Sequence, residues 1–177
     1  MSAPLDPAGA RLQGLPPVIG QHTRLVLLGS FPGAASLAAG QYYAHPRNQF
    51  WPLLSALLAE DLTALPYARR LQRLRSRGLG LWDVIGECRR QGSLDTAIRE
   101  ARYNDLASLR RRAPQLVAVA HNGGASARLM PVTAALGLAV YRLPSSSPAN
   151  ASWSFERKLA AWREVFQACG VAATPRA

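Results

Sequence analysis

Short apolar runs alternate with helically spaced segments along most of the chain. Continuous apolar runs, typical of strands that are buried on both faces, occur at residues 24–29, 79–85, 116–121 and 138–143. Helical spacing of apolar positions occurs at residues 50–60, 66–77, 105–112, 125–136 and 154–169. Asn104 is a candidate cap for the third helix. This alternation predicts parallel strands joined by right-handed helical crossovers.

We therefore expect an α/β fold with three α/β/α layers and a central four-stranded parallel sheet. Residues 1–20 are rich in proline and show no periodic pattern, which predicts an extended N-terminal arm. Residues 21–177 are expected to form a single domain, since 177 residues with 49% hydrophobic content fit one core. Ligands of such sheets bind beyond the carboxyl ends of the strands, so the loops that follow the strands are the candidate site.

The charge of the chain narrows the class of partner. Lys and Arg number 21 against 10 Asp and Glu, a net charge of +11, and Lys158 is the only lysine. Such a basic surface favours a phosphate-bearing partner, nucleic acid first. The alternative is that the arginines reflect genome base composition and lie on ordinary solvated faces. Lys158 itself is expected on a solvated helical face with an ordinary pKa.

Other features argue against several classes of protein. No apolar run reaches the ~18 residues of a membrane helix, and the N-terminus lacks the order of a signal peptide, so we expect a cytoplasmic protein without a membrane partner. The histidines are scattered, and Cys88 and Cys169 are the only cysteines, which argues against a zinc or iron–sulfur site. We expect no metal, no cofactor and a monomer.

The first candidate loop reads Gly29-Ser30-Phe31-Pro32-Gly33. Two glycines let a backbone turn sharply and bring its N–H groups close to a ligand. The same composition also serves turn geometry alone, and the loop lacks the order of a P-loop.

A second, more specific segment follows at residues 42–51, YYAHPRNQFW. The pair GSFPG and YAHPRNQFW resembles the mismatch-specific uracil and thymine DNA glycosylases, in which the corresponding motifs are G-I-N-P-G and Pro-x-Asn-x-Phe-Trp. It is most similar to the hypoxanthine-DNA glycosylase branch of the uracil-DNA glycosylase superfamily. The resemblance continues at residues 81–95, at His121-Asn122-Gly123 and at the LPSSSPAN segment of residues 143–150.

The resemblance implies a DNA repair enzyme that flips a deaminated base, most of all hypoxanthine, and hydrolyses its N-glycosidic bond to leave an abasic site. Removal of uracil or of a mismatched G·U or G·T pyrimidine is the alternative. One departure is Phe31, which occupies the place of the water-orienting asparagine. The resemblance implies that this role moves to Asn48, although Asn48 can instead simply cap the helix that begins at residue 50.

The resemblance also assigns roles to other side chains, each with a structural alternative. It implies that Tyr43 stacks on the flipped base, where the alternative is core packing. His45 is a candidate proton donor to a purine leaving group or a structural histidine. Asp83 either accepts a ring N–H of the base or caps a turn. Asn122, in the HNG motif, is expected to contact the base.

The LPSSSPAN loop resembles the segment that enters the DNA minor groove. It supplies the expected DNA contacts, together with Arg47: Pro144, Ser145, Ser146, Ser147, Pro148 and Asn150. Relatives carry a larger wedge residue near positions 147–149, where this chain has only small residues. Insertion into the base stack is therefore either weak or made by another segment.

Two further classes of function stay open. Phe31 is compatible with a non-catalytic nucleic-acid-binding domain on the same fold. A small-molecule hydrolase using Ser30 or Ser145 is the other class, but neither serine lies in a G-x-S-x-G sequence.

Overall fold

The computed structural model describes residues 9–172. Its strands (β), α-helices (α) and short 3-10 helices (η) are, in chain order, β1 (Arg11–Gln13), β2 (Leu25–Gly29), α1 (Ala34–Ala39), α2 (Phe50–Leu58), η1 (Leu62–Ala64), α3 (Tyr67–Ser76), β3 (Leu79–Asp83), β4 (Ile85–Arg89), η2 (Asp95–Ala97), β5 (Arg99–Tyr103), η3 (Leu106–Ser108), α4 (Leu109–Arg112), β6 (Ala118–Asn122), α5 (Gly124–Ala127), α6 (Met130–Ala134), β7 (Ala139–Leu143) and α7 (Phe155–Ala168).

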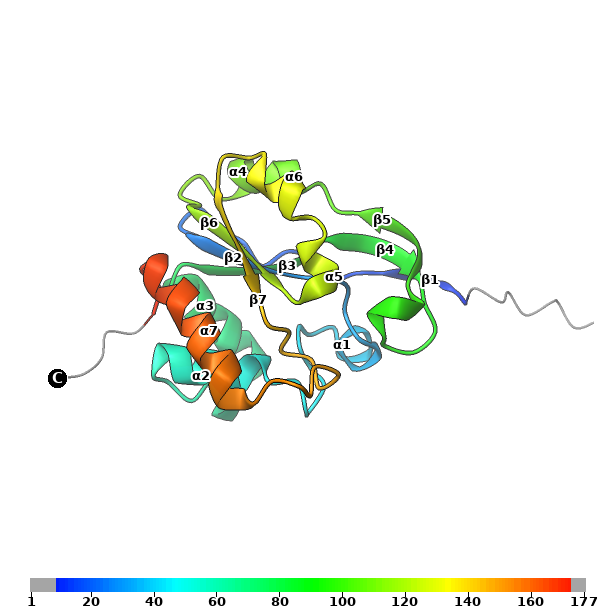
Figure 1. Cartoon of the computed structure of the whole chain (residues 1–177), viewed down its shortest axis with the longest axis horizontal. Coiled ribbons are helices and arrows are strands. Elements are labelled where there is room, and N and C mark those ends of the chain that lie inside the picture. The colour runs from blue at the N-terminus through cyan, green and yellow to red at the C-terminus, as the bar shows by residue number, and fades with distance from the viewer. Residues whose placement is uncertain (1–8, 173–177) are drawn as a thin grey trace, which may run out of the picture.

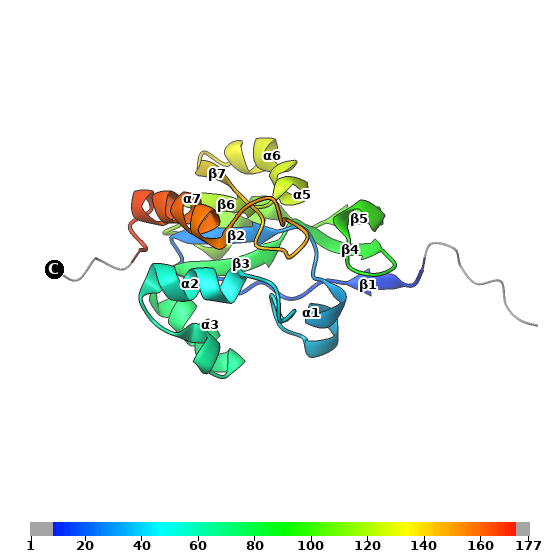
Figure 2. The same cartoon turned by 60° about the horizontal axis from the view of Figure 1, so that its bottom comes forward.

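The central sheet has the strand order β3-β2-β6-β7, and all three pairings are parallel. Figures 1 and 2 show α2, α3 and α7 on one side of this sheet and α4, α5 and α6 on the other. Within the described residues, the predicted three-layer α/β fold with a four-stranded parallel sheet is confirmed.

Each face of the sheet has its own hydrophobic core. Leu25 and Leu27 of β2 pack with α2, α3 and α7, whereas Val26 and Leu28 pack toward α4 and the segment around α6. All four side chains are fully buried. Burial on both faces is why this strand reads as a continuous apolar run.

The apolar run at 79–85 is not the single strand that we predicted. β3 ends at Asp83, and the backbone N–H groups of Val84 and Ile85 donate to the carbonyls of Gly29 and Ser30. The chain then enters β4, which belongs to a separate antiparallel sheet of order β1-β4-β5. The sequence does not reveal this second sheet, because β5 is mostly exposed and carries charged rather than apolar residues.

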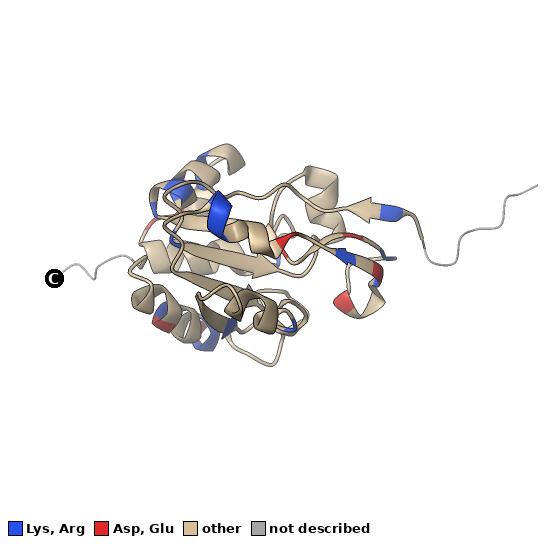
Figure 3. Ribbon diagram, turned by 90° about the horizontal axis from the view of Figure 1, so that it is seen from above, with Lys and Arg blue, Asp and Glu red and all other residues tan. Residues whose placement is uncertain are grey.

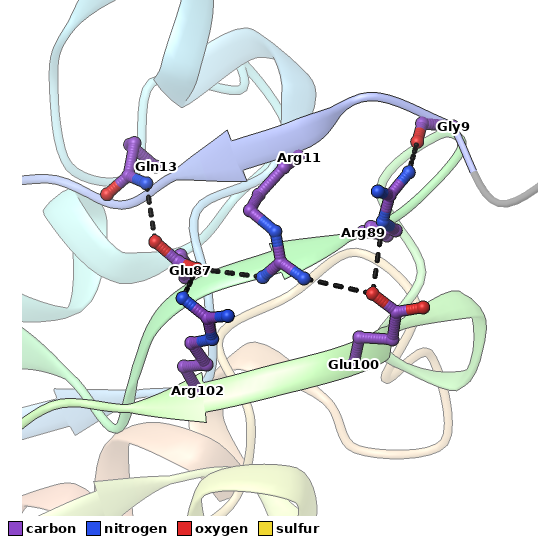
Figure 4. Close-up of polar contacts among 7 residues, drawn as sticks. All are labelled: Gly9, Arg11, Gln13, Glu87, Arg89, Glu100 and Arg102. Atoms are coloured by element: carbon purple, nitrogen blue, oxygen red, sulfur yellow. Dashed lines mark hydrogen bonds and ion pairs between the residues drawn. The ribbon is translucent and has the colours of Figure 1, made fainter. Parts of the chain in front are cut away.

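Charged side chains tie the small sheet together (Figure 4). Arg11 of β1 pairs with Glu87 of β4 at 2.8 Å and with Glu100 of β5 at 2.9 Å. Arg102 also pairs with Glu87, at 2.9 Å, and Arg89 with Glu100, at 3.1 Å. The N-terminal arm was expected at residues 1–20, and β1, an edge strand of the small sheet, lies within it. Residues 1–8 lie outside the described part of the chain. The boundary at residue 20 stays a prediction.

Two predicted helices differ in detail from the structure. The helix expected at 125–136 is two short helices, α5 and α6, and the one expected at 105–112 is the turn η3 followed by the four-residue α4. Asn104 does not cap it, because its Nδ2 donates to the carbonyl of Asp83 at 2.8 Å. The short helix α1, behind the first glycine-rich loop, had no counterpart among the predictions.

Candidate active site

A cavity of about 760 Å³ opens at the carboxyl end of the central sheet. The last residues of the four parallel strands all line it: Gly29 of β2, Asp83 of β3, Asn122 of β6 and Leu143 of β7. The volume falls within the range of small-molecule sites, of roughly 300–1,000 Å³. The cavity lies beyond the carboxyl ends of the parallel strands, where ligands of such sheets bind.

Most residues singled out in the sequence line this cavity. Those that do are Gly29, Ser30, Phe31, Pro32, Gly33, Tyr43, His45, Asn48, Asp83, Asn122, Pro144, Ser145, Ser146, Ser147, Pro148 and Asn150. Arg47 is exposed and lies outside the lining. Segments far apart in the sequence therefore meet around one space, although their roles there stay predictions.

Gly29 is required by the crowding at the floor of the cavity. It pairs with Asp83 across β2 and β3. A Cβ atom at position 29 would collide with Oδ1 of Asp83 and lie 3.1 Å from the hydroxyl of Tyr43. A larger residue would therefore displace one of these two side chains.

Asp83 is a buried carboxyl group, only 5% exposed, and its Oδ2 has no hydrogen-bond partner within residues 9–172. Burial, together with the negative charge of Asp95, raises the pKa of Asp83 to about 7, against the opposing charge of Arg90. The protonated and ionised forms of this carboxyl group therefore both exist near neutral pH.

Phe31 and Arg90 contact each other and support the GSFPG loop. The Phe31 ring is 6% exposed and packs with the core on the α4 face, and the Arg90 guanidinium lies 5.2 Å from its centre. Nη2 of Arg90 donates to the carbonyl of Pro32 at 2.6 Å, which fixes the turn of the GSFPG loop. The side chain of Phe31 thus mainly supports the loop from behind.

Tyr43 combines a packed ring with a position on the cavity. One face of its ring stacks on Phe50, with centroids 3.8 Å apart and an interplanar angle of 13°. Its hydroxyl accepts a hydrogen bond from Nδ2 of Asn122 at 3.2 Å. The backbone of Tyr43 has a positive φ of 55°, a conformation uncommon for a bulky residue that surrounding contacts must hold in place.

The Asn122 amide connects the loops. Its Nδ2 also donates to the Ser146 hydroxyl at 2.9 Å, and its Oδ1 accepts the Ser146 backbone N–H at 3.0 Å. Both ends of the amide are engaged by protein groups. The geometry therefore fits positioning of Tyr43 and the loop after β7 better than direct contact with a base.

Asn48 lines the cavity and also contacts the start of α2, although the N-cap residue of that helix is Gln49 and not Asn48. Its Oδ1 accepts the backbone N–H of Phe50, the first residue of α2, at 3.0 Å. A carbonyl oxygen has two lone pairs, so this contact leaves one for a water molecule while fixing the orientation of the amide. Asn48 can therefore hold the start of α2 and orient a water molecule in the cavity at the same time.

His45 lies at the exposed rim of the cavity. Its Nδ1 accepts the backbone N–H of Arg47 at 3.1 Å, which holds the imidazole ring against its own loop. His45 lines the cavity, and its role as a proton donor stays a prediction.

The loop that joins β4 to β5 also lines the cavity, although the sequence motifs gave its residues no role. It contributes Ser93, Leu94, Asp95 and Thr96. The Ser30 hydroxyl donates to Oδ1 of Asp95 at 2.6 Å, and the Ala34 N–H donates to the Ser93 hydroxyl at 2.9 Å. These contacts connect the loop to the segment after β2. The periodicity of the sequence does not predict them.

Lys158 is not the solvated residue that we expected. It is 2% exposed, and its Nζ donates to Oε1 of Gln49 at 2.8 Å. Burial lowers the pKa of Lys158. Gln49 in turn donates its backbone N–H to the carbonyl of Ser146 at 2.9 Å, so α7 supports the junction between the Asn48 segment and the loop after β7.

The arginines do not gather on one face. Figure 3 shows Lys and Arg segments distributed over several elements. Arg73 pairs with Glu60 at 2.8 Å and Arg77 donates to the carbonyl of Leu58 at 3.2 Å, so part of the α3 cluster serves the fold. Arg142, at the end of β7, is exposed and lines the cavity.

Residues 9–172 contain no group of three or more His, Cys, Asp or Glu side chains placed to hold a metal ion. In the same part of the chain, no helix has both the length and the apolar character needed to cross a membrane.

Comparison with known proteins gives consistent matches. The family model described as the uracil DNA glycosylase superfamily matches residues 16–167. Proteins named hypoxanthine DNA glycosylase from Methanosarcina barkeri and Methanosarcina acetivorans are 40% and 34% identical, each over 88% of this chain and 98% of the relative. The solution NMR structure of a Methanosarcina acetivorans protein, described as a candidate uracil DNA glycosylase, matches with a TM-score of 0.82 and 33% identity over 91% of this chain and 99% of that one. The chain therefore belongs to the uracil DNA glycosylase superfamily, as its motifs predicted.

Proposed function

We propose that this protein is a monofunctional DNA glycosylase that hydrolyses the N-glycosidic bond of a flipped deaminated base, with hypoxanthine as the preferred base. The observation that carries the proposal is the joint presence of the Asp83 carboxyl group and the Asn48 amide on one cavity at the carboxyl end of the sheet. The names of the two archaeal relatives agree with this substrate.

Asp83 supplies the means of reading the base. Hypoxanthine presents a ring N1–H donor beside a carbonyl acceptor, and the buried carboxyl group can accept that N–H. Adenine carries a lone pair at the same ring nitrogen, so it would leave an ionised Asp83 without a partner there. A buried polar group left unpaired is costly, which gives selectivity for the deaminated base.

The flipped base is expected to stack on Tyr43. One ring face of Tyr43 is fixed on Phe50, so the ring is a rigid platform for a base on its other side. Stacking of this kind contributes about 1–3 kcal/mol per base. The GSFPG loop lines the cavity, and its non-proline backbone N–H groups are the candidates to stabilise charge on the departing base.

Bond cleavage needs a positioned water molecule and stabilised charge more than a strong nucleophile. The Asn48 amide, fixed by its contact with Phe50, orients the water through its remaining lone pair. His45 is the candidate donor of a proton to the purine. We propose that the protein acts as a monomer without a cofactor.

Loops at the rim would hold the DNA. In the LPSSSPAN loop, the hydroxyls of Ser145 and Ser147 each accept a backbone N–H of the loop and keep their own hydrogen to donate to a phosphate, and Arg47 and Arg142 supply positive charge. A cytoplasmic location stays a prediction from the sequence.

The decisive experiment is a cleavage panel. Oligonucleotides bearing inosine, uracil, xanthine or a G·T mismatch are incubated with the enzyme and treated with alkali, and single-turnover rates are compared. We expect inosine to be cleaved fastest and uracil more slowly. Preferred cleavage of uracil or thymine would correct the base, and tight binding without cleavage of any substrate would favour a non-catalytic DNA-binding domain.

A further inference from the structure

The fold leaves one requirement of base flipping unassigned. An enzyme that extrudes a base usually inserts an apolar side chain into the gap, because the neighbouring bases otherwise restack. The loop after β7 presents Ser145, Ser146, Ser147, Pro148 and Ala149 near the cavity. The serine and alanine side chains are too small to fill the space of a base pair, and the ring of Pro148 is tied back to its own backbone and reaches less far than a leucine side chain.

Leu94 has the properties that the loop after β7 lacks. Among residues 9–172, the large hydrophobic side chains that are exposed are Leu94 at 60%, Tyr103 at 59%, Val132 at 45% and Val117 at 41%. Of these four, Leu94 alone lines the cavity. An exposed leucine beside a pocket for a base is unfavourable in free solution and favourable once it is covered by stacked bases.

The segment that presents Leu94 is anchored on both sides of that residue. The preceding Ser93 accepts the Ala34 N–H at 2.9 Å, and the following Asp95 accepts the Ser30 hydroxyl at 2.6 Å. η2 begins directly after Leu94. A wedge must resist the pressure of the base stack, and a residue between two anchors on the GSFPG segment meets that need.

We propose that Leu94 is the wedge that enters the base stack when the target nucleotide is flipped. Figures 1 and 2 show the connection between β4 and β5 and the loop after β7 as separate projections beside the carboxyl end of the sheet. The loop after β7 then grips phosphates while Leu94 fills the gap. This inference rests on the proposed DNA glycosylase function.

The test compares Leu94→Ala and Leu94→Phe with the parent enzyme on inosine in duplex and in single-stranded DNA. Tyr103→Ala is the matched control, since Tyr103 is equally exposed but lies outside the cavity lining. We expect Leu94→Ala to lower the single-turnover rate on duplex DNA by at least about tenfold, to leave the rate on single strands near the parental value, and Leu94→Phe to retain activity. Equal losses on both substrates, or no loss on duplex DNA, would overturn the proposal.

A binding measurement keeps this test separate from the proposed function. Duplex DNA with an abasic-site analogue and a neighbouring 2-aminopurine reports unstacking by fluorescence without any cleavage. We expect the fluorescence increase of the parent protein to be lost in Leu94→Ala and kept in Tyr103→Ala. If the parent cleaves no base yet shows this pattern, the wedge stands and the enzymatic function fails; an unchanged increase in Leu94→Ala removes the wedge.

Discussion

Nζ of Lys158 in α7 donates a 2.8 Å hydrogen bond to the side-chain oxygen of Gln49, the residue that follows Asn48. The ammonium group is buried, and it supports the segment that carries the proposed water-orienting amide. Gln49 also donates its backbone N–H to the carbonyl of Ser146, so it connects Lys158 to the loop after β7. The single lysine of the chain is thus a structural group behind the site and does not line the cavity.

The product of the reaction follows from this placement. Combined glycosylase–lyase enzymes attack the sugar with an amine, and a lysine with a lowered pKa has the required reactivity. Lys158 is nevertheless held by Gln49 outside the cavity, so we expect an intact strand with an abasic site. Borohydride should trap no covalent complex, and strand breaks should require alkali. An adduct that forms with the parent and disappears in Lys158→Met would refute the monofunctional assignment.

Replacement of Asn48 separates its two contacts. Asn48→Ala should lower the single-turnover rate by about 10²- to 10³-fold, as the loss of a positioned catalytic group does elsewhere. It should also destabilise the fold by ~1 kcal/mol, because the Phe50 N–H loses its acceptor. Asn48→Ser, whose hydroxyl can accept the same N–H, should recover the stability but not the rate. Full activity in either variant would reduce Asn48 to a helix cap.

The buried Asp83 predicts a pH-dependent stability. Its pKa rises from 3.8 to about 7 on folding, so between these values the folded state binds the proton and the unfolded state does not. The free energy of unfolding should therefore fall as pH rises from about 4 to about 7 and change little from this group above that range. Urea titrations at several pH values should show a shallower slope in Asp83→Asn. Asp95→Asn should shift the fall to lower pH, because the Asp95 charge contributes to the raised pKa.

Salt dependence of binding locates the DNA. Arg142→Gln and Arg47→Gln should each reduce the slope of log K against log salt by about 1, if these side chains neutralise phosphates at the rim. Arg73→Gln and Arg77→Gln are the controls, since both arginines already contact Glu60 or the Leu58 carbonyl. A reduced slope in the controls with no change in the first pair would place the DNA on the α3 face.

The sequence predicts the central layer well because that layer is a matter of hydrophobic periodicity. Strands buried on both faces leave apolar runs that end where the cavity begins, as β2 and β6 do. The sheet of β1, β4 and β5 is held by ion pairs between residues far apart in sequence, and alternating charge resembles an ordinary solvated surface. No local sequence pattern distinguishes a strand held by such ion pairs from an ordinary solvated segment.

The burial of Lys158 can be predicted from the sequence. It stands four residues before Trp162 and seven before Val165, both buried, so helical periodicity places it on the inner face of α7. The charge of Lys158 favours a solvated face, but this helical spacing outweighs the charge. The contacts of Asn122 with Tyr43 and Ser146 were beyond reach, because they join three segments whose proximity only the fold creates.

The β1 strand gives the small sheet an unusual order of assembly. Arg11 reaches Glu87 across 76 positions of sequence, and β5 follows later still. During synthesis β1 is made well before β4 and stays unpaired until about half of the chain has appeared. The β4–β5 hairpin that carries Leu94 ends at Tyr103, before β6 and β7, so the small sheet can form while the parallel core still lacks two of its strands.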